Sequence, residues 1–323
     1  MAATTARVTP MKMPARIAAG DLRSDFDLSQ DELLSVLDLT SRVKHAPARY
    51  ARSLSGRYLS LLFEKPSLRT RLTFELAIKQ LGGDAVVSMG PIGDREPLKD
   101  IARNLDRWTQ CIVARTFRQQ TIDDLAFWSR VPVINALSDL YHPCQALADV
   151  FTLRERFQAR FQDDLRGRKL AFIGDGNNVA HSLMLAAVRL GMDFALATPQ
   201  RYQADSKVLE QATALAAISG ATLTVGNDPE AAVTGADAVY ADVWTSMGQE
   251  DQQAQRLRDF DGFQVDERLF ALARPHAAFM HCLPAHRGEE VTDAVMECAG
   301  SVVFDQAENR LHVQKALLLM LLS

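Results

Sequence analysis

The chain has 323 residues, a hydrophobic fraction of 47% and a formal net charge of −4 at pH 7. This length predicts about two domains, and the composition excludes collagen-like and low-complexity proteins. The slightly acidic charge disfavours a general nucleic-acid binder, which shows a strong basic excess. The longest wholly apolar run, Ala316 to Leu322, is far shorter than the roughly 20 residues that cross a membrane. We therefore expect neither a nucleic-acid partner nor a membrane segment.

Residues 1–25 are expected to form a disordered tail. The basic residues Arg7, Lys12 and Arg16 precede the first acidic residue, which faintly resembles a mitochondrial transit peptide. Prolines between these residues would break the amphipathic helix that such a peptide needs. We expect a cytoplasmic protein, with the mitochondrial matrix as the alternative.

The four cysteines form no C-x-x-C pair; they are Cys111, Cys144, Cys282 and Cys298. This pattern indicates neither a disulfide framework nor a zinc ribbon. The expected setting is a reducing compartment.

The first half of the chain alternates between helix and strand patterns. Ser29 and Glu32 form a capping box, and the apolar spacing after it predicts a helix to about Val43. Strands are predicted at 58–63, 85–88, 111–114 and 131–135, and helices at 68–81, 97–108, 122–130 and 144–161. Apolar strands separated by helices are typical of a parallel sheet with crossover connections.

The same alternation restarts after residue 150. Strands are predicted at 169–173, 194–197, 222–225, 238–241 and 278–280, and helices at 179–190, 205–218 and about 308–322. The polar stretch 244–261 is expected to be irregular. We therefore predict an α/β fold of two consecutive doubly wound parallel-sheet domains, residues 1–150 and 151–323. The C-terminal helix is expected to return to the first domain.

A candidate phosphate-binding motif follows the first predicted strand. The segment S-L-R-T-R (67–71) lies where a helix begins, and a helix N-terminus offers unpaired N–H groups and a partial positive charge to an anion. The hydroxyls of Ser67 and Thr70 add donors, and arginine forks fit a phosphate. A serine cap beside solvated arginines is the plainer interpretation. Because Arg69 and Arg71 cannot share one face, at least one points inward or along the loop.

Two further motifs end at the same edge of the first predicted sheet. Arg115 follows a strand, and H-P-C-Q (142–145) opens the next helix, at the carboxyl edge where α/β proteins bind ligands. A buried arginine there is costly without an anion. His142 and Gln145 can each donate to a carbonyl oxygen. A helix start with Pro143 at its first position explains this motif equally well.

The segment G-D-G-N-N-V (174–179) matches a dinucleotide-binding fingerprint only in part. Its last position is Val179 rather than a small residue, and the next strand ends at Thr198 without an acidic residue. Nicotinamide binding is therefore disfavoured. The tight turn is expected to aim Asn177 and Asn178 into the cleft.

Three motifs of the second half carry further polar groups. Asp242 opens D-V-W-T-S-M-G (242–248) and has the charge to pair with an ammonium group. Cys282 in H-C-L-P (281–284) is a candidate nucleophile, a soft hydrogen-bonding group or, most commonly, a buried structural cysteine. Arg310, near the start of the last predicted helix, adds another arginine at this edge.

The set of motifs resembles that of the carbamoyltransferase family, and within it the members that act on ornithine. The matching segments are F-E-K-P-S-L-R-T-R (63–71), H-P-C-Q-A-L-A-D (142–149), G-D-G-N-N (174–178), D-V-W-T-S-M-G (242–248), H-C-L-P (281–284) and A-E-N-R-L-H (307–312). They follow the family's order and cover the chain from about residue 25. Each is modest alone, but the ordered set is highly specific.

The resemblance implies a reaction, in which carbamoyl phosphate and L-ornithine give L-citrulline and phosphate, most simply in arginine biosynthesis. It implies that carbamoyl phosphate is bound by Ser67, Leu68, Arg69, Thr70, Arg115, His142, Gln145, Cys282, Leu283 and Arg310. It implies that ornithine is bound by Asn178, Asp242, Ser246 and Met247, with Cys282 and Leu283 completing that pocket. The implied catalytic residues are Arg115, His142, Cys282 and Arg310, of which His142 and Arg310, with Gln145, polarise the carbamoyl carbonyl.

The resemblance also implies a homotrimer, or a multiple of trimers, with active sites near subunit interfaces and no metal or organic cofactor. The implied chemistry needs alignment and charge stabilisation rather than a covalent intermediate. The attacking amine has a pKa near that of lysine, about 10.4, so activity is expected to rise with pH above neutrality.

The sequence departs from the family pattern at two places. Leu68 replaces the usual threonine of the phosphate motif, which removes one hydroxyl donor. The loop at 91–96 lacks the glutamine that often contributes to the site. Neither change touches the implied amino-acid pocket.

Several alternatives stay open at this point. Aspartate, putrescine and acylated ornithine are rival acceptors within the family. Aspartate is a dicarboxylate that needs cations, so Asp242 has the wrong sign for it. Putrescine would not need an acidic residue and the S-M-G loop to hold an α-amino acid, and an acyl group would hide the ammonium that Asp242 pairs with. A non-catalytic homologue would have lost site residues, and a nicotinamide dehydrogenase would need the missing acidic residue near Thr198.

Overall fold

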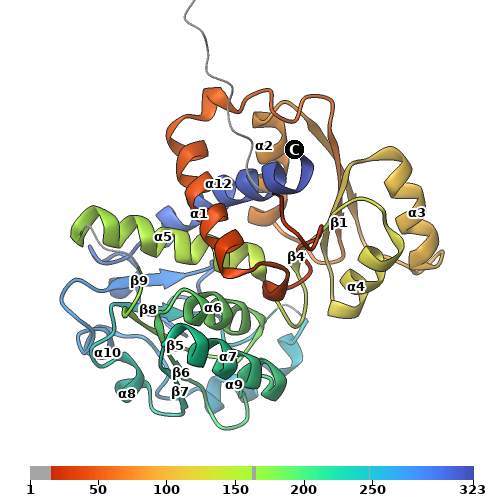
Figure 1. The fold of residues 1–323 in the computed structure, drawn as a ribbon. Helices are drawn as coiled ribbons and strands as arrows, with labels where there is room; N and C mark the ends of the chain where they lie inside the picture. Colours follow the sequence, from red (N-terminus) through yellow and green to blue (C-terminus); the bar gives the residue numbers. More distant parts are fainter. Residues whose placement is uncertain (1–15, 162–164, 247) are drawn as a thin grey trace, which may run out of the picture.

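The computed structural model describes residues 16–161, 165–246 and 248–323, which form two lobes (Figure 1). The first lobe has a parallel sheet of strand order β2-β1-β3-β4. Its strands are β1 (Tyr58–Phe63), β2 (Asp84–Met89), β3 (Cys111–Arg115) and β4 (Val133–Leu137). Its helices are η1 (Asp25–Asp27), α1 (Gln30–His45), η2 (Pro47–Arg49), α2 (Arg69–Gln80), α3 (Leu98–Trp108) and α4 (Gln119–Trp128).

The second lobe has a parallel sheet of strand order β7-β6-β5-β8-β9. Its strands are β5 (Lys169–Ile173), β6 (Asp193–Ala197), β7 (Leu223–Gly226), β8 (Ala238–Ala241) and β9 (Ala278–His281). Its helices are α6 (Asn178–Arg189), α7 (Ser206–Ser219), α8 (Pro229–Val233), η3 (Glu250–Gln252), α9 (Gln253–Asp259), α10 (Glu267–Phe270) and α11 (Asp293–Met296). The strands β5, β8 and β9 are buried along nearly their whole length, as expected for a sheet covered on both faces.

Two long helices connect the lobes, α5 (Pro143–Phe161) and α12 (Val303–Leu322). Figure 1 shows α12 lying beside α1 and α2 of the first lobe, and it also packs on α5. The prediction of two doubly wound parallel sheets with a returning C-terminal helix is therefore confirmed. The expected boundary at residue 150 falls inside α5, so the lobes are joined by a helix. No helix in the described parts of the chain is long and apolar enough to span a membrane.

The elements with clear sequence signals lie where they were predicted. Strand β1 has the predicted bounds, and Ser29 caps α1 in a capping box with Glu32. The last helix begins at Val303 rather than near residue 308. Its buried face carries Gln306 and Arg310 beside apolar residues, so apolar spacing alone does not reveal its first turns. The stretch 244–261, expected to be irregular, contains the short helix α9.

The N-terminal segment is more ordered than predicted. Residues 1–15 of the expected disordered tail lie outside the described residues, but Ile17, Leu22 and Asp25 are buried in the first lobe and its interface with the second. Leu22 exchanges backbone hydrogen bonds with Val133 and Asn135 beside β4. Residues 16–25 are therefore part of the fold.

Candidate active site

A cavity of about 560 Å³ lies between the lobes, at the carboxyl ends of both sheets. Loops after β1, β3 and β4 reach it from the first lobe, and loops after β5, β8 and β9 reach it from the second. The predicted site residues that line it are Ser67, Leu68, Arg69, Thr70, Arg115, His142, Gln145, Asn178, Asp242, Ser246, Cys282, Leu283 and Arg310. The remaining one, Met247, lies outside the described residues. The fold thus brings together residues that are up to 243 positions apart (310 − 67).

Three arginines face the cavity from the first lobe and from α12. Burial lowers the pKa of Arg69, and burial together with the nearby Arg310 lowers the pKa of Arg115 to about 10. Arg310 is 3% exposed, and its Nε has no hydrogen-bond partner, as is also true of Arg115 Nε. Partly dehydrated cations side by side are costly unless an anion joins them. This wall of the cavity is therefore built for a negatively charged ligand.

Arg71 does not take part in this cluster. It turns away along α2 and pairs with Glu75, with Nε at 3.6 Å from Oε1. As expected, the two arginines do not share one face: Arg69 lines the cavity and Arg71 does not.

The Arg310 guanidinium is held in one orientation by two hydrogen bonds. It donates to Gln145 Oε1 at 2.6 Å and to Thr70 Oγ1 at 2.5 Å. The Gln145 amide nitrogen donates in turn to Asp149 Oδ1 at 2.7 Å, and Gln306 donates to the same oxygen at 2.6 Å. Asp149 is fully buried, and burial raises its pKa to about 7 against the effect of these donors. It therefore fixes which end of the Gln145 amide faces Arg310.

His142 lies at the start of α5, beside the arginines. It is 3% exposed, and its Nδ1 has no hydrogen-bond partner. Burial, with Arg310 and Arg115 nearby, lowers its pKa well below the usual value. The imidazole is therefore neutral near pH 7, able to donate one hydrogen bond without adding charge.

Asp242 and Cys282 face the arginines from the second lobe. The Cys282 thiol donates to Asp242 Oδ1 at 3.0 Å, and Asn177 donates to Oδ2 at 2.8 Å. Burial and Asp242 raise the pKa of Cys282 well above its usual value, so the thiol is protonated near pH 7. A protonated thiol is a poor nucleophile.

Asn177 and Asn178, which follow β5, were both expected to point into the cavity, but only Asn178 lines it. Asn178 lines the cavity, and its amide nitrogen donates to Ser138 O at 2.5 Å. Asn177 caps α6 through its Oδ1 and holds Asp242 through its Nδ2. The expectation that Asn177 points into the cleft is wrong, because both ends of its amide are used in these contacts.

The turn after β9 is held from beneath by a buried pair. Leu283 has a φ of 59°, which is uncommon for leucine. Its backbone N–H donates to His281 Nδ1 at 2.9 Å, and His281 Nε2 lies 3.0 Å from Glu290 Oε1. Both His281 and Glu290 have no exposed surface. The pair therefore fixes the unusual backbone beside Cys282.

Ligand atoms of Asp242, His281 and Cys282 also lie within 4.8 Å of one another. In this arrangement the thiol donates to Asp242 and both ring nitrogens of His281 have partners. The group is explained by these hydrogen bonds and provides no separate argument for a metal ion.

Some lining residues were not singled out from the sequence. Lys65, Gln253 and His286 contribute polar side chains to the cavity. Lys65 stands two residues before Ser67, within the segment 63–71 that resembles the family, so its position was a usable signal. Gln253 and His286 stand in loops or short helices with no distinctive pattern around them.

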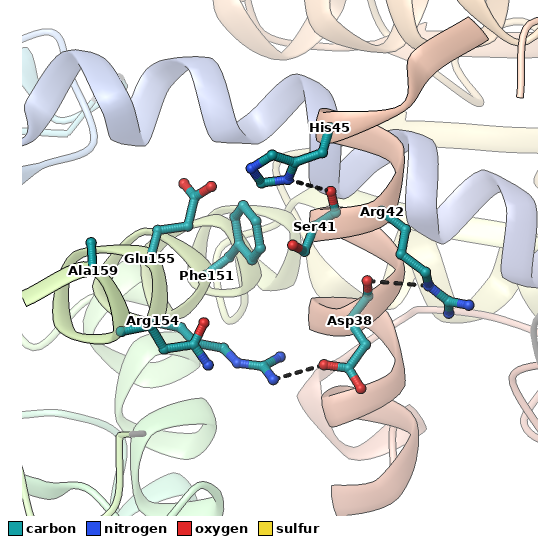
Figure 2. Close-up of a pocket in the computed structure, with 9 residues that line it drawn as sticks. Asp38, Ser41, Arg42, His45, Phe151, Arg154, Glu155 and Ala159 are labelled. Atoms are coloured by element: carbon teal, nitrogen blue, oxygen red, sulfur yellow. Dashed lines mark hydrogen bonds and ion pairs between the residues drawn. The ribbon is translucent and has the colours of Figure 1, made fainter. Parts of the chain in front are cut away.

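A second large groove lies between α1 and α5, away from the motifs (Figure 2). Figure 2 shows Arg154 reaching across it to Asp38, with the two charged groups 2.7 Å apart. His45 contacts Ser41 O, and Glu155 pairs with Lys44 at 2.9 Å. Because both of its carboxylates are paired within the protein and none of the sequence motifs reaches it, we do not regard this groove as the functional site.

Comparison with known proteins identifies the family of the chain. Residues 21–155 match the aspartate/ornithine carbamoyltransferase carbamoyl-P binding domain, and residues 166–321 match the Asp/Orn binding domain of the same family. The chain belongs to the aspartate/ornithine carbamoyltransferase family.

Individual members of the family match nearly the whole chain. Ornithine carbamoyltransferase from Listeria innocua is 46% identical over 97% of this chain and 98% of its own length. The solved ornithine carbamoyltransferase from Pyrococcus furiosus has a TM-score of 0.89 at 44% identity, covering 94% and 97% of the two chains. The anabolic ornithine carbamoyltransferase from Campylobacter jejuni has a TM-score of 0.87 at 37% identity, covering 93% and 98%.

The family division corresponds to the two walls of the cavity. The carbamoyl-P binding domain supplies Arg69, Arg115 and His142, while the Asp/Orn binding domain supplies Asp242 and Cys282. Arg310 also lies in the range matched to the Asp/Orn binding domain, but α12 carries it back to the first lobe. The carbamoyltransferase chain thus places cationic groups on one wall and a carboxylate on the other.

Proposed function

We propose that this family member transfers the carbamoyl group of carbamoyl phosphate to the side-chain amine of L-ornithine, giving L-citrulline and phosphate. The observation that carries the proposal is the opposition of Arg69, Arg115 and Arg310 to Asp242 across one cavity. The cationic wall suits a phosphate dianion, and the carboxylate suits the α-ammonium group of an amino acid. The relatives named for ornithine support this pairing.

The phosphate is assigned to the start of α2 and to the arginines. Ser67, the Leu68 backbone N–H, Arg69 and Thr70 stand at the helix N-terminus, where backbone donors and the helix dipole attract an anion. Arg115 closes the site from the neighbouring strand. Leu68 keeps its backbone donor although it lacks the hydroxyl.

The carbamoyl carbonyl is assigned to Arg310 and His142. As the amine attacks, negative charge develops on the carbonyl oxygen, and donors fixed beforehand stabilise it at little reorganisation cost. Arg310 is fixed by Gln145 and Thr70, and neutral His142 adds a donor. We assign to Gln145 the orientation of Arg310 as well as contact with the carbamoyl group. Leu283 is assigned to the same group through its fixed backbone.

The amino-acid end of ornithine is assigned to Asn178, Asp242 and Ser246, with Met247 added from the family resemblance. The substrate then extends along the cavity so that its side-chain amine faces the carbamoyl carbon. The C–N bond forms as the C–O bond to phosphate breaks, and the amine proton leaves with the phosphate, which is basic enough to accept it. No protein acid or base is required for this balance.

Cys282 is assigned a polar rather than a covalent role. Its protonated thiol and its hydrogen bond to Asp242 favour recognition of ornithine and the carbamoyl group over nucleophilic attack.

We further propose a homotrimer, or a multiple of trimers, acting in the cytoplasm in arginine biosynthesis. Support for assembly comes from α2, where Leu68, Leu72 and Leu76 form an exposed apolar row directly beside the cavity, at 66%, 40% and 45% exposure. Support for biosynthesis comes from the similarity to the anabolic enzyme of Campylobacter jejuni.

The test is a panel of acceptors. Carbamoyl phosphate is supplied with ornithine, N-acetylornithine, putrescine or aspartate in separate reactions, and the carbamoylated product is measured. The proposal predicts citrulline from ornithine and little product from the others, because only ornithine offers both a free α-ammonium for Asp242 and a side-chain amine. Turnover with another amine alone would preserve the phosphate assignment and overturn the acceptor.

A further inference from the structure

A buried chain of hydrogen bonds connects the N-terminal segment to His142. The Ser182 hydroxyl donates to Asp25 Oδ2 at 2.5 Å and accepts the backbone N–H of His142 at 2.8 Å. Asp25, Ser182 and His142 are 6%, 0% and 3% exposed. They belong to η1, to α6 and to the residue that precedes α5. This chain of hydrogen bonds thus connects the two lobes, and it ends at His142, which lines the cavity.

Asp25 is a costly residue at this place. A carboxylate removed from water is destabilising unless partners compensate it. Arg189 lies nearby, but its guanidinium donates to the backbone oxygens of Asp25 and Leu28, at 2.5 and 2.7 Å. Ser182 is therefore the group that donates directly to the Asp25 side chain across the lobe interface. None of the steps assigned to the cavity uses this carboxylate.

When Asp25 is ionised, its carboxylate fixes the direction of this chain of hydrogen bonds. Because it only accepts, the Ser182 hydroxyl must donate to it, which leaves the Ser182 lone pairs for the N–H of His142. Phe26 reinforces the contact by packing edge-on against Tyr141, with ring centroids 6.3 Å apart. Two adjacent residues of the N-terminal segment thus hold two adjacent residues at the start of α5.

The backbone of His142 sets the first turn of α5. Its carbonyl accepts the N–H groups of Gln145 and Ala146, at 3.0 and 3.2 Å. A shift of this peptide would therefore move both His142 and Gln145, which line the cavity.

We propose that Asp25 and Ser182 are positioning residues for carbamoyl transfer, which hold His142 in place through its backbone N–H. The inference rests on the proposed function, because its effect is measured on that reaction. A misplacement of about 1 Å in a catalytic group can lower a rate by about a hundredfold. Loss of these hydrogen bonds is therefore expected to lower kcat more than it weakens the binding of ornithine.

The test compares Ser182→Ala, Asp25→Ala and the double variant. Each single variant is expected to lower kcat by about tenfold or more, with the KM for ornithine unchanged. The double variant is expected to be no slower than Ser182→Ala, because both residues act through one chain. Asp25→Asn keeps an acceptor oxygen and is expected to recover most of kcat.

The matched control is Thr40→Val, which removes a buried hydroxyl of α1 that donates to Val36 O at 2.7 Å, away from the cavity. It is expected to lower the thermal unfolding temperature without changing kcat per folded molecule. A merely structural role for Ser182 would give the same result as this control and would overturn the inference. Additive losses in the double variant would also overturn it.

Two further outcomes separate the inference from the proposed function. Wild-type protein that forms no citrulline would overturn the proposed function and this inference together, whereas an active wild type with unchanged variants would overturn the inference alone. If Ser182→Ala does not fold, the comparison of Asp25→Ala with Asp25→Asn decides, since equal kcat in the two variants would contradict the proposed chain.

Discussion

Cys282 and Asp242 form one hydrogen-bonded unit on the wall of the cavity. The thiol donates to Oδ1 of the carboxylate at 3.0 Å, while Asn177 donates to Oδ2 at 2.8 Å. Asp242 is thereby held in one orientation, and the thiol stays protonated. The unit relates the H-C-L-P segment to the acidic motif after β8, which lies 40 positions earlier in the chain.

Removing the thiol tests this unit. Cys282→Ala is expected to lower kcat/KM for ornithine by about tenfold, because Asp242 loses one of its donors and about 1 to 2 kcal/mol of stabilisation. Cys282→Ser retains a donor and is expected to lose less. Initial-rate measurements at saturating carbamoyl phosphate give both values. Mass spectrometry of the protein during turnover should show no carbamoyl adduct, and a trapped adduct on Cys282 would show that the residue is a nucleophile.

The two arginines of the phosphate motif provide a matched pair. Arg69→Ala is expected to weaken carbamoyl phosphate binding by about tenfold or more, because it removes a charge-assisted donor from a partly dehydrated site. Arg71→Ala removes the same charge two positions further along α2, where it pairs with Glu75, and is expected to leave binding nearly unchanged. Titration calorimetry with carbamoyl phosphate or inorganic phosphate measures both. Equal effects of the two substitutions would contradict the assignment of Arg69.

The loop that carries Ser246 is anchored by a buried ion pair. Arg256 donates from Nη1 to Asp175 Oδ2 at 2.6 Å and to Trp244 O at 2.7 Å. Arg256→Lys keeps the charge but shortens the side chain and removes the Nε donor that contacts Gln252 Oε1 at 3.4 Å. We expect a higher KM for ornithine, by about tenfold, with the KM for carbamoyl phosphate unchanged. Steady-state kinetics with each substrate varied in turn would detect the split, and an equal rise in both constants would argue against an anchor specific to this loop.

The buried Asp25 predicts a particular dependence of stability on pH. Burial raises its pKa from 3.8 to about 7, although Ser182 and Arg189 oppose the shift and Asp27 adds to it. The folded state therefore binds more protons than the unfolded state between these values, so this residue makes the free energy of unfolding fall as pH rises. Asp25→Asn does not titrate. The difference in unfolding temperature between Asp25→Asn and wild type should increase from pH 5 to pH 8, and a constant difference would contradict the raised pKa.

Much of the site was predictable because its residues stand in compact motifs at element ends. Ser67 to Thr70 open a helix after an apolar strand, and His142 and Cys282 follow other strands, so a parallel sheet brings them to one edge. The capping box at Ser29 and the apolar run of β1 are equally local signals.

The remaining features depend on contacts between distant segments. Arg256 lies in a polar stretch, and only the folded chain shows that it reaches Asp175, 81 positions earlier. Arg310 lies inside α12, more than a turn after the helix begins. The buried face of that helix is partly polar, so an analysis of apolar spacing does not find its first turns. The contact of Asp25 with Ser182 spans 157 positions and has no sequence signature.

The most direct measurement is the amount of citrulline formed per phosphate released when the wild-type protein is given carbamoyl phosphate and ornithine. Carbamoyl transfer predicts equal amounts of the two products, with phosphate release that depends on ornithine. Phosphate release without citrulline would show that the arginine cluster binds and cleaves a phosphate compound but that the opposite wall does not present ornithine. Formation of neither product by the folded protein would contradict the account of the cavity as a carbamoyltransferase site.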